Sequence, residues 1–491
     1  MKFFKLFIML FLLSFVNFCF AQSTNLSKQQ MQQDISFLAN AIKEIDPNLL
    51  VRQAVTGTNL YQELDSLVNL SNDISSFDNF YMLANKLLQL TQDQHHQFVD
   101  YYPFEINEKN PYITTKNIDF SKNIFQQYEE FLPCCGGFFS IKYIDGNYFN
   151  IENLYTETDT AEKNVLMPAG AKLLKINDIP IDKYVNDFLR PVDNTVRWDM
   201  KRKKYYTLSI HHPFYSLKRT MEAFITYEMD NKTETVEYKN TSVVGYNPMG
   251  DFSVQYFETD KILYIRIPSM DYEKINFLTT EIQKYKSQKI NKVIIDIRYN
   301  GGGTDEVWSS VLSAIIKKTL KIKSNVYLKN TPIVRDYITN ICNEKITKTL
   351  KINEIEYIDV DTTNFDIIKP SENSLNYNGK IYVLVNEKIF SSSLAFVSVC
   401  KQVKNFVTVG VSTGYICGRS TTPFFLSLPN SKLIFELVPC IDMTNKKKSI
   451  DYYDMQAEIP VCITVDDYIK EVNNSKQLYT KDFLYNHDPV F

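Results

Sequence analysis

The chain has 491 residues, which is too long for one compact core and indicates two to four domains. Its hydrophobic share of 44% is that of an ordinary globular protein. The formal net charge is -3 and no long run of like charge occurs, so the composition gives no reason to expect a nucleic-acid partner.

The first residues have the pattern of an export signal. Lys2 and Lys5 precede an apolar run that ends in Cys-Phe-Ala, and this order is typical of a secretory signal peptide. The run is short for a membrane span. We therefore expect cleavage after Ala21 and a periplasmic or secreted mature chain without an integral membrane span. The cysteines are irregularly spaced and form no CxxC pair, so no zinc site is indicated.

Residues 22–135 are predicted to form an N-terminal helical domain. From Ser27, a good helix cap, apolar residues recur at the 4-3-4-3 spacing of an amphipathic helix. Two further helices are expected over residues 61–70 and 77–90. The unit runs on through "LTQDQHHQFVDYYP", which contains adjacent histidines.

Residues 136–245 are predicted to be β-rich, with a hairpin at Asp145-Gly146. Residues 246–491 alternate strands and helices, which indicates an α/β layer. Expected strands include "KVIIDIRY" and "KIYVLVN", and helices are expected over residues 272–286 and 304–318 and after Ser391.

Two junctions of this α/β unit have the composition of a reaction site. In "VIIDIRYNGGGTDEVW" three glycines follow a buried strand and precede a helix, which lets a bound group approach bare backbone N–H groups. In "GKIYVLVNEKIFSSSLAF" three serines follow a strand and begin a helix. Taken singly, a structural turn and a helix N-cap explain them equally well or better. Together they can supply a nucleophile and an oxyanion hole.

The sequence resembles the C-terminal processing (tail-specific) serine proteases. "VIIDIRYNGGG" resembles their Asp-Leu-Arg-x-Asn-x-Gly-Gly segment, and "GKIYVLVNEKIFSSSLAF" and "VTVGVSTGY" resemble the nucleophile turn and the Gly-x-x-Thr-Gly turn. "AGAKLLKINDIPI" resembles the core of their PDZ-like domain, and "LTQDQHHQFV" resembles the Leu-x-Asp-Gly-His-Thr segment of the tricorn-like branch. The resemblance implies a PDZ-like domain over 136–245 and a crotonase-like ββα serine peptidase domain over 246–491.

By this resemblance Ser391 is the nucleophile, and the N–H groups of Ser392 and Gly302 form the oxyanion hole. Gly302 is preferred to Gly301, because relatives tolerate proline at the position of Gly301. The position of the general-base lysine of one branch holds Ile416, which makes a Ser–Lys dyad improbable.

The general base is therefore expected to be His95, with His96 as the alternative, since histidine titrates near neutral pH. The orienting carboxylate is expected to be Asp454, with Glu458 as the alternative. Asp296 and Arg298 are interpreted as structural supports of the glycine turn.

The resemblance implies an exported serine endopeptidase that needs no metal or cofactor and binds a peptide or protein substrate by its C-terminus, through strand addition to the PDZ-like domain. Departures from the family pattern are Gln94, Leu394 and Val461, at places usually held by glycine, glutamate and aspartate. The alternatives are a catalytically inactive peptide-binding protein and a carrier of apolar ligands on the same fold.

Overall fold

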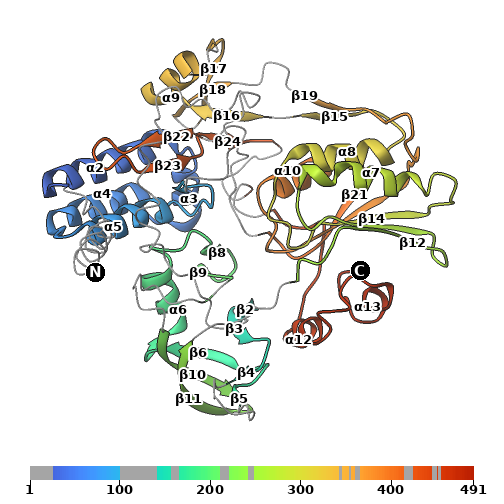
Figure 1. The fold of residues 1–491 in the computed structure, drawn as a ribbon, viewed down its shortest axis with the longest axis horizontal. Coiled ribbons are helices and arrows are strands. Elements are labelled where there is room, and N and C mark those ends of the chain that lie inside the picture. The colour runs from blue at the N-terminus through green and yellow to red at the C-terminus, as the bar shows by residue number, and fades with distance from the viewer. Residues whose placement is uncertain are drawn as a thin grey trace, which may run out of the picture.

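The structure is a computed structural model, and Figure 1 shows its fold. The predicted signal peptide, the adjacent cysteines 134 and 135, and Asp454 lie outside the residues it describes. No helix in the described part of the chain is long and apolar enough to cross a membrane. The described residues are 26–99, 141–155, 165–208, 210, 221–240, 248–323, 325–341, 345–352, 355–359, 365–413, 424–444, 451 and 455–491.

The N-terminal unit consists of packed helices, as predicted. Ser27 caps the first of them through a capping box with Gln30, in which each side chain bonds the other residue's backbone N–H. The short helix α3 was not predicted from the sequence. The bounds are α2 (Lys28–Ile45), α3 (Leu49–Thr56), α4 (Leu60–Leu70) and α5 (Phe77–Leu90).

Strands from much later in the chain complete the core of these helices (Figure 1). Phe424, Phe435 and Cys440 are buried in the same cluster as Ile35 and Leu38. The strand β1 (Gln97–Phe98), which follows the two histidines, pairs antiparallel with β23. This pairing brings the histidine turn to the second half of the chain. The late strands are β16 (Val326–Lys329), β22 (Phe424–Ser427), β23 (Ile434–Leu437) and β24 (Cys440–Asp442).

The second unit is built on an antiparallel sheet in the order β11-β10-β6-β3-β2. The predicted hairpin at Asp145-Gly146 is confirmed, and both residues have the positive φ that this turn requires. Its elements are β2 (Ile141–Ile144), β3 (Asn147–Asn150), β4 (Leu154–Tyr155), β5 (Val165–Met167), β6 (Lys172–Ile176), β7 (Ile179–Pro180), α6 (Ile181–Tyr184), η4 (Val185–Leu189), β8 (Arg197–Asp199), β9 (Lys204–Tyr206), β10 (Met221–Met229) and β11 (Lys232–Asn240).

The third unit contains a sheet in the order β12-β13-β14-β20-β21-β25, parallel except for β12. The predicted alternation of strands and helices is confirmed, and the whole fold is mixed α/β. The bounds are β12 (Ser253–Phe257), β13 (Ile262–Arg266), η5 (Tyr272–Lys274), α7 (Ile275–Gln283), β14 (Lys292–Asp296), α8 (Asp305–Ile315), β20 (Ile381–Val385), α10 (Ser392–Cys400), β21 (Phe406–Gly410) and β25 (Ile459–Pro460).

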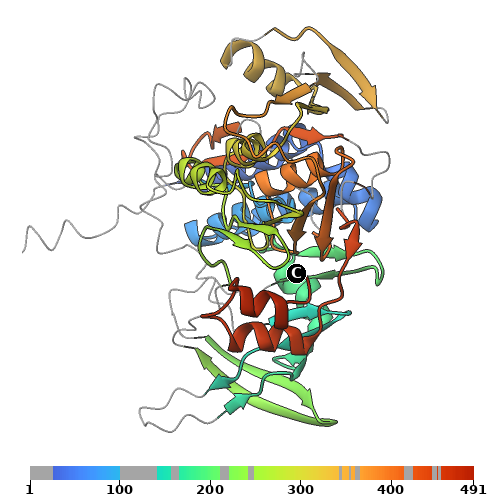
Figure 2. The same ribbon diagram turned by 90° about the vertical axis from the view of Figure 1, so that its right-hand side faces the viewer.

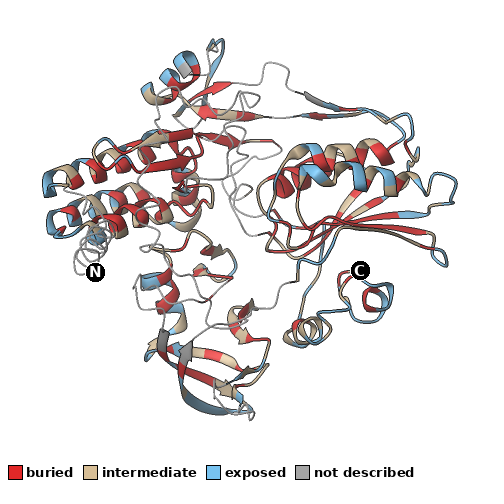
Figure 3. Ribbon diagram, in the orientation of Figure 1, coloured by how far each residue is buried: buried red, intermediate tan, exposed pale blue. Residues whose placement is uncertain are grey.

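Both faces of this sheet are covered. Helices α7, α8 and α10 pack on one face, and Figure 3 shows that the outer sides of α7 and α8 are exposed. Tyr479, Leu484 and Val490, in and around the C-terminal helices α12 (Val465–Asn473) and α13 (Lys481–Asn486), pack on the other face. In Figure 2 these helices lie below the sheet. Burial on both faces explains the nearly continuous apolar runs of β13, β14 and β20.

A sheet that the sequence did not reveal extends from the third unit over the N-terminal helices. Its order is β17-β18-β16-β24. The remaining bounds are η1 (Ser71–Asp73), β15 (Leu320–Lys323), α9 (Pro332–Asp336), η6 (Tyr337–Ile341), β17 (Thr349–Ile352), β18 (Ile355–Asp359) and β19 (Phe365–Ile368).

Candidate active site

The glycine turn and the serine turn meet at one edge of the parallel sheet. β14 and β20 are parallel neighbours, so the turns that follow them lie at the same edge, where α/β proteins commonly bind ligands. The turns also bond to each other: the Phe390 N–H donates to the Asn300 carbonyl at 3.0 Å, and the Tyr299 N–H donates to Asn386 Oδ1 at 2.9 Å. Each turn therefore fixes the position of the other.

Ser391 lies at the tip of the serine turn in a conformation that non-glycine residues rarely adopt. Its φ is 53° and its ψ is -122°, and helix α10 begins at the next residue. Such a conformation costs about 1–3 kcal/mol and persists only where the surroundings enforce it, as they do at active sites. The side chain stands at a strand-to-helix turn, the usual location of a nucleophilic serine in α/β hydrolases.

His95 is brought to Ser391 from a segment 296 residues earlier in the chain. Its Nε2 lies 3.3 Å from Ser391 Oγ, and its ring packs on Phe390 with the ring centroids 4.6 Å apart. The side chain is mostly buried, with 14% of its surface exposed. A separation of this size between a base and a nucleophile is normal for a site without substrate.

Asp93 lies on the far side of His95. Its Oδ1 is 3.0 Å from His95 Nδ1 and also accepts the His95 backbone N–H at 3.0 Å. The carboxylate is fully buried. Burial opposes its ionisation, but His96, His95 and Arg52 outweigh burial and hold the pKa of Asp93 well below its ordinary value. An ionised Asp93 accepts a hydrogen bond from the Nδ1–H of His95. In this tautomer Nε2 carries the lone pair, which faces Ser391 Oγ.

His96, the sequence-based alternative for the base, is turned into the core. Its Nε2 accepts the Val438 N–H at 2.9 Å, so the proton of the neutral ring is on Nδ1, which lies 2.9 Å from Thr91 Oγ1. Burial lowers its pKa below the ordinary value. Its role in the structure is to join the end of α5 to the chain beyond β23.

Replacement of His96 should destabilise the fold. His96→Ala removes the acceptor of the buried Val438 N–H and leaves a cavity, so we expect the free energy of unfolding at pH 8 to fall by about 2–4 kcal/mol in chemical denaturation. Because the folded pKa is depressed, the wild-type contribution is complete above the unfolded pKa of about 6.5 and is lost as the pH falls below it. His487→Ala, at an exposed position, is the control and should change stability by less than about 0.5 kcal/mol.

Gly302 packs directly against the serine turn. Its φ is +104°, and a Cβ built there would lie 2.6 Å from Ser391 Cβ and 2.9 Å from the Phe390 carbonyl oxygen. Its N–H donates to Asn300 Oδ1 at 2.9 Å. The structure thus places Gly302 next to Ser391. The Gly302 N–H must give up its hydrogen bond to Asn300 Oδ1 before it can donate to an oxyanion.

Ser392 is the first residue of α10, and its N–H has no acceptor among the described residues. Its hydroxyl donates to Asp305 Oδ1 at 2.6 Å, and the same oxygen accepts the Trp308 Nε1–H at 3.0 Å. Asp305 begins α8, so the N-terminal ends of α8 and α10 are joined beside Ser391. The N-terminal end of a helix favours negative charge, and α10 begins directly after Ser391.

The other predicted residues have different positions. Arg298 donates to Asp296 through Nε and Nη2, as expected for a support of the glycine turn, and additionally makes a bidentate pair with Asp488 of the C-terminal segment at 2.9 and 2.7 Å. Glu458 is exposed, and its backbone N–H bonds Thr408 on β21. Asp454 and Ile416 lie outside the described residues.

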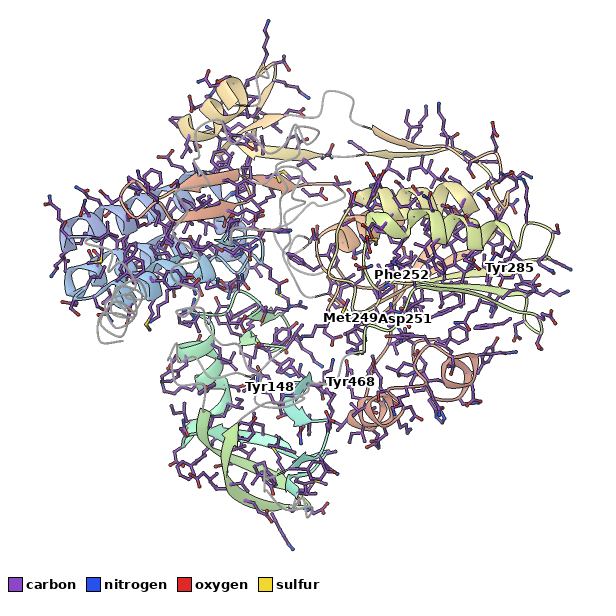
Figure 4. All side chains as sticks on the ribbon, in the orientation of Figure 1. Tyr148, Met249, Asp251, Phe252, Tyr285 and Tyr468 are labelled. Atoms are coloured by element: carbon purple, nitrogen blue, oxygen red, sulfur yellow. The ribbon has the colours of Figure 1, made fainter. Side chains whose placement is uncertain are left out.

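The second unit bonds directly to the site. Arg197 Nη1 donates to the Thr413 carbonyl at 2.6 Å and to the carbonyl of Glu387, and Lys142 Nζ lies 3.1 Å from Glu387 Oε1. Asn194 Nδ2 donates to the Asp93 carbonyl at 3.3 Å. Figure 4 shows Tyr468 of α12, and the centroid of its ring lies 4.5 Å from Lys142 Nζ. The serine turn is therefore supported by all three units.

Asp93 is the site residue that the sequence interpretation missed. It lies two residues before His95 in "DQHH", a spacing that allows an acid to cap the turn and to reach the imidazole. The described residues contain no group of three or more side chains suited to hold a metal ion.

Part of the chain matches the model of a known family, and the fold is similar to that of solved structures. Residues 261–452 match the model of peptidase family S41. The chain is similar in structure to mature CPAF, with 14% identity over 94% of this chain and 99% of that chain and a TM-score of 0.58, and to mature CPAF complexed with lactacystin, with 14% identity over the same shares and a TM-score of 0.56. The similarity to the photosystem II D1 C-terminal processing protease has 12% identity over 92% and 98% of the chains and a TM-score of 0.41. No curated protein sequence matches the chain.

Proposed function

We propose that this chain, which belongs through residues 261–452 to peptidase family S41, a family of serine-type peptidases, hydrolyses peptide bonds with Ser391 as its nucleophile and His95 as its base. The observation that supports this assignment most directly is the 3.3 Å contact between His95 Nε2 and Ser391 Oγ. The strained backbone of Ser391 and the N-termini of α8 and α10 beside it are consistent with the same role.

The proposed mechanism is acyl transfer in two steps. His95 Nε2 takes the Ser391 proton while Oγ attacks the carbonyl carbon, and His95 then gives this proton to the leaving amine as the C–N bond breaks. In the second step His95 takes a proton from water, which attacks the acyl carbon. The ester bond to Ser391 Oγ then breaks, His95 returns the proton to Oγ, and the acid product is released. Asp93 stabilises the imidazolium that forms in each step.

The oxyanion would be held by the Ser392 N–H and by the Gly302 N–H. The Ser392 N–H has no acceptor among the residues that the structure describes. The Gly302 N–H would exchange its bond to Asn300 Oδ1 for one to the oxyanion. Oxyanion donors of this kind typically contribute 10²–10³-fold to the rate.

Substrate class and location follow from the resemblance in sequence. We propose an exported endopeptidase of peptides or unfolded proteins, with a PDZ-like second unit over 136–245 that binds the substrate C-terminus by strand addition and a crotonase-like catalytic domain over 246–491. The bonds from Arg197 and Lys142 to the serine turn give such a unit a direct connection to the nucleophile. The N-terminal domain, 22–135, would supply the base.

The alternatives are an inactive peptide-binding protein and a carrier of apolar ligands. A carrier requires no contact between the serine and the histidine, so the observed pair favours the peptidase. Turnover separates the peptidase from the inactive binder, and the following variants test for it.

The orienting carboxylate is tested with Asp93→Asn and Asp454→Asn. If Asp93 orients His95, Asp93→Asn should reduce kcat/KM on a fluorescently labelled unfolded protein by about 10²–10⁴-fold at pH 8. The neutral amide favours the wrong tautomer of His95 and does not stabilise its imidazolium. Asp454→Asn should retain activity within a few-fold. The opposite result would assign the role to Asp454, and absence of turnover by the folded wild type would favour the binding protein.

A further inference from the structure

A buried arginine from the N-terminal helices lies behind the Ser391–His95–Asp93 chain. Arg52, on α3, has 1% of its side-chain surface exposed. Its Nη1 donates to Asp46 Oδ2 at 2.8 Å, and its Nη2 lies 3.9 Å from Asp93 Oδ2. Asp46 is itself held in place, because its other oxygen accepts the Asn48 N–H at 2.7 Å. Burial of the Arg52, Asp46 and Asp93 charges costs desolvation energy, which is offset only where the charges pair closely.

Arg52 lies near Oδ2 of Asp93, the carboxylate oxygen that is not bonded to His95. Oδ1 of Asp93 is bonded to His95, whereas Oδ2 is buried and accepts no hydrogen bond from the described residues. A carboxylate in that environment loses its hydration and takes up a proton unless a positive charge is near. The guanidinium of Arg52 is a charge of this kind, and it stays protonated at every relevant pH.

His96 and His95 also lower the pKa of Asp93, but each of them supplies a positive charge only while its imidazole is protonated. His96 is neutral, because its Nε2 accepts an N–H and burial lowers its pKa. Burial, with a smaller contribution from Asp93, raises the pKa of Glu436 on β23 to about 7. When this carboxyl group ionises, it adds negative charge. Asp46 is a carboxylic acid and supplies no positive charge.

We propose that Arg52 is a positioning residue of the peptidase site: it keeps the Asp93 carboxylate ionised and directed at His95 Nδ1, so that Nε2 faces Ser391. The inference rests on the proposed function for its catalytic meaning. The N-terminal helices then have two roles. They carry the turn that contains His95, and they supply the arginine that keeps the Asp93 carboxylate ionised.

The test measures the protonation of His95 directly, by NMR of the imidazole carbons in protein labelled at histidine, with His95→Gln to assign the signal. Removal of a positive charge makes protonation of the Asp93–His95 pair easier. In Arg52→Gln the titration midpoint of His95 should therefore rise by about one pH unit. Arg52→Lys, which retains the charge, should restore most of the wild-type midpoint.

The matched control is Arg190→Gln, which removes a partly buried bidentate salt bridge to Glu63 of α4. Its His95 midpoint should equal that of the wild type. If Arg52→Gln does not fold, the double variant Asp46→Asn/Arg52→Gln, which removes the pair together, takes its place. An unchanged midpoint in the folded variant overturns the proposal.

Activity provides a second measurement that separates the two proposals. In Arg52→Gln the acid limb of the kcat/KM profile should move to higher pH by about the same amount, with a loss of about tenfold near pH 7 that recovers at pH 9. A merely structural arginine predicts an equal loss at all pH values. Absence of wild-type turnover would refute the peptidase function, whereas the NMR midpoint would still decide the role of Arg52.

Discussion

Ser391→Ala should reduce kcat on an unfolded protein substrate by about 10⁴–10⁶-fold while the protein remains folded. The change removes only the hydroxyl oxygen that lies 3.3 Å from His95 Nε2, so the residual rate reflects binding and the oxyanion donors alone. The assay compares initial rates at pH 8, with circular dichroism to verify the fold.

The chain contains its own control for this experiment, because three serines occur in a row. Ser393 is fully buried, and its Oγ has no hydrogen-bond partner among the described residues. Removal of an unpaired hydroxyl costs little, so Ser393→Ala should retain activity within a few-fold. Equal activity of Ser391→Ala and wild type would exclude Ser391 as the nucleophile.

Gly302→Ala should produce the second large effect. The added Cβ would meet Ser391 Cβ at 2.6 Å and the Phe390 carbonyl at 2.9 Å, and the φ of +104° is unfavourable for any L side chain. Either the glycine turn or the serine turn must shift, and both position the proposed oxyanion site. We expect kcat to fall by at least about 10²-fold and the melting temperature to decrease.

Gly301→Ala is the matched control for the glycine turn. Gly301 does not have a left-handed φ, and a Cβ there would meet no atom within 4 Å. The N–H remains in an alanine, so activity should stay within about twofold of wild type. A loss of activity in Gly301→Ala as large as that in Gly302→Ala would contradict the assignment of the close approach to Gly302.

The sequence predicted the local elements where pattern and packing agree. The helix from Ser27, the hairpin at Asp145-Gly146 and the helix after Ser391 each have a cap, a turn signal or a periodic apolar face, and each is present. The structure places Ser391 and His95 together, as the resemblance implied, although their catalytic roles are still a proposal.

Other features depend on contacts between distant segments and leave no local pattern. The apolar side chains of β23 are buried in the core of the N-terminal helices. No periodicity within residues 434–437 predicts that these helices are their partner. No local sequence pattern marks Asp93 or Arg52 as buried. Their burial depends on tertiary contacts: the N-terminal helices pack on one another, and the strand β1 after the histidine turn pairs with β23.

The most direct measurement is covalent labelling of the wild-type protein with a fluorophosphonate probe, followed by mass spectrometry of the peptides. We predict one labelled site, Ser391, and loss of labelling in His95→Ala, because only a serine beside a base is activated toward the probe. Labelling of another serine, or labelling of Ser391 that persists in His95→Ala, would contradict the Ser–His assignment.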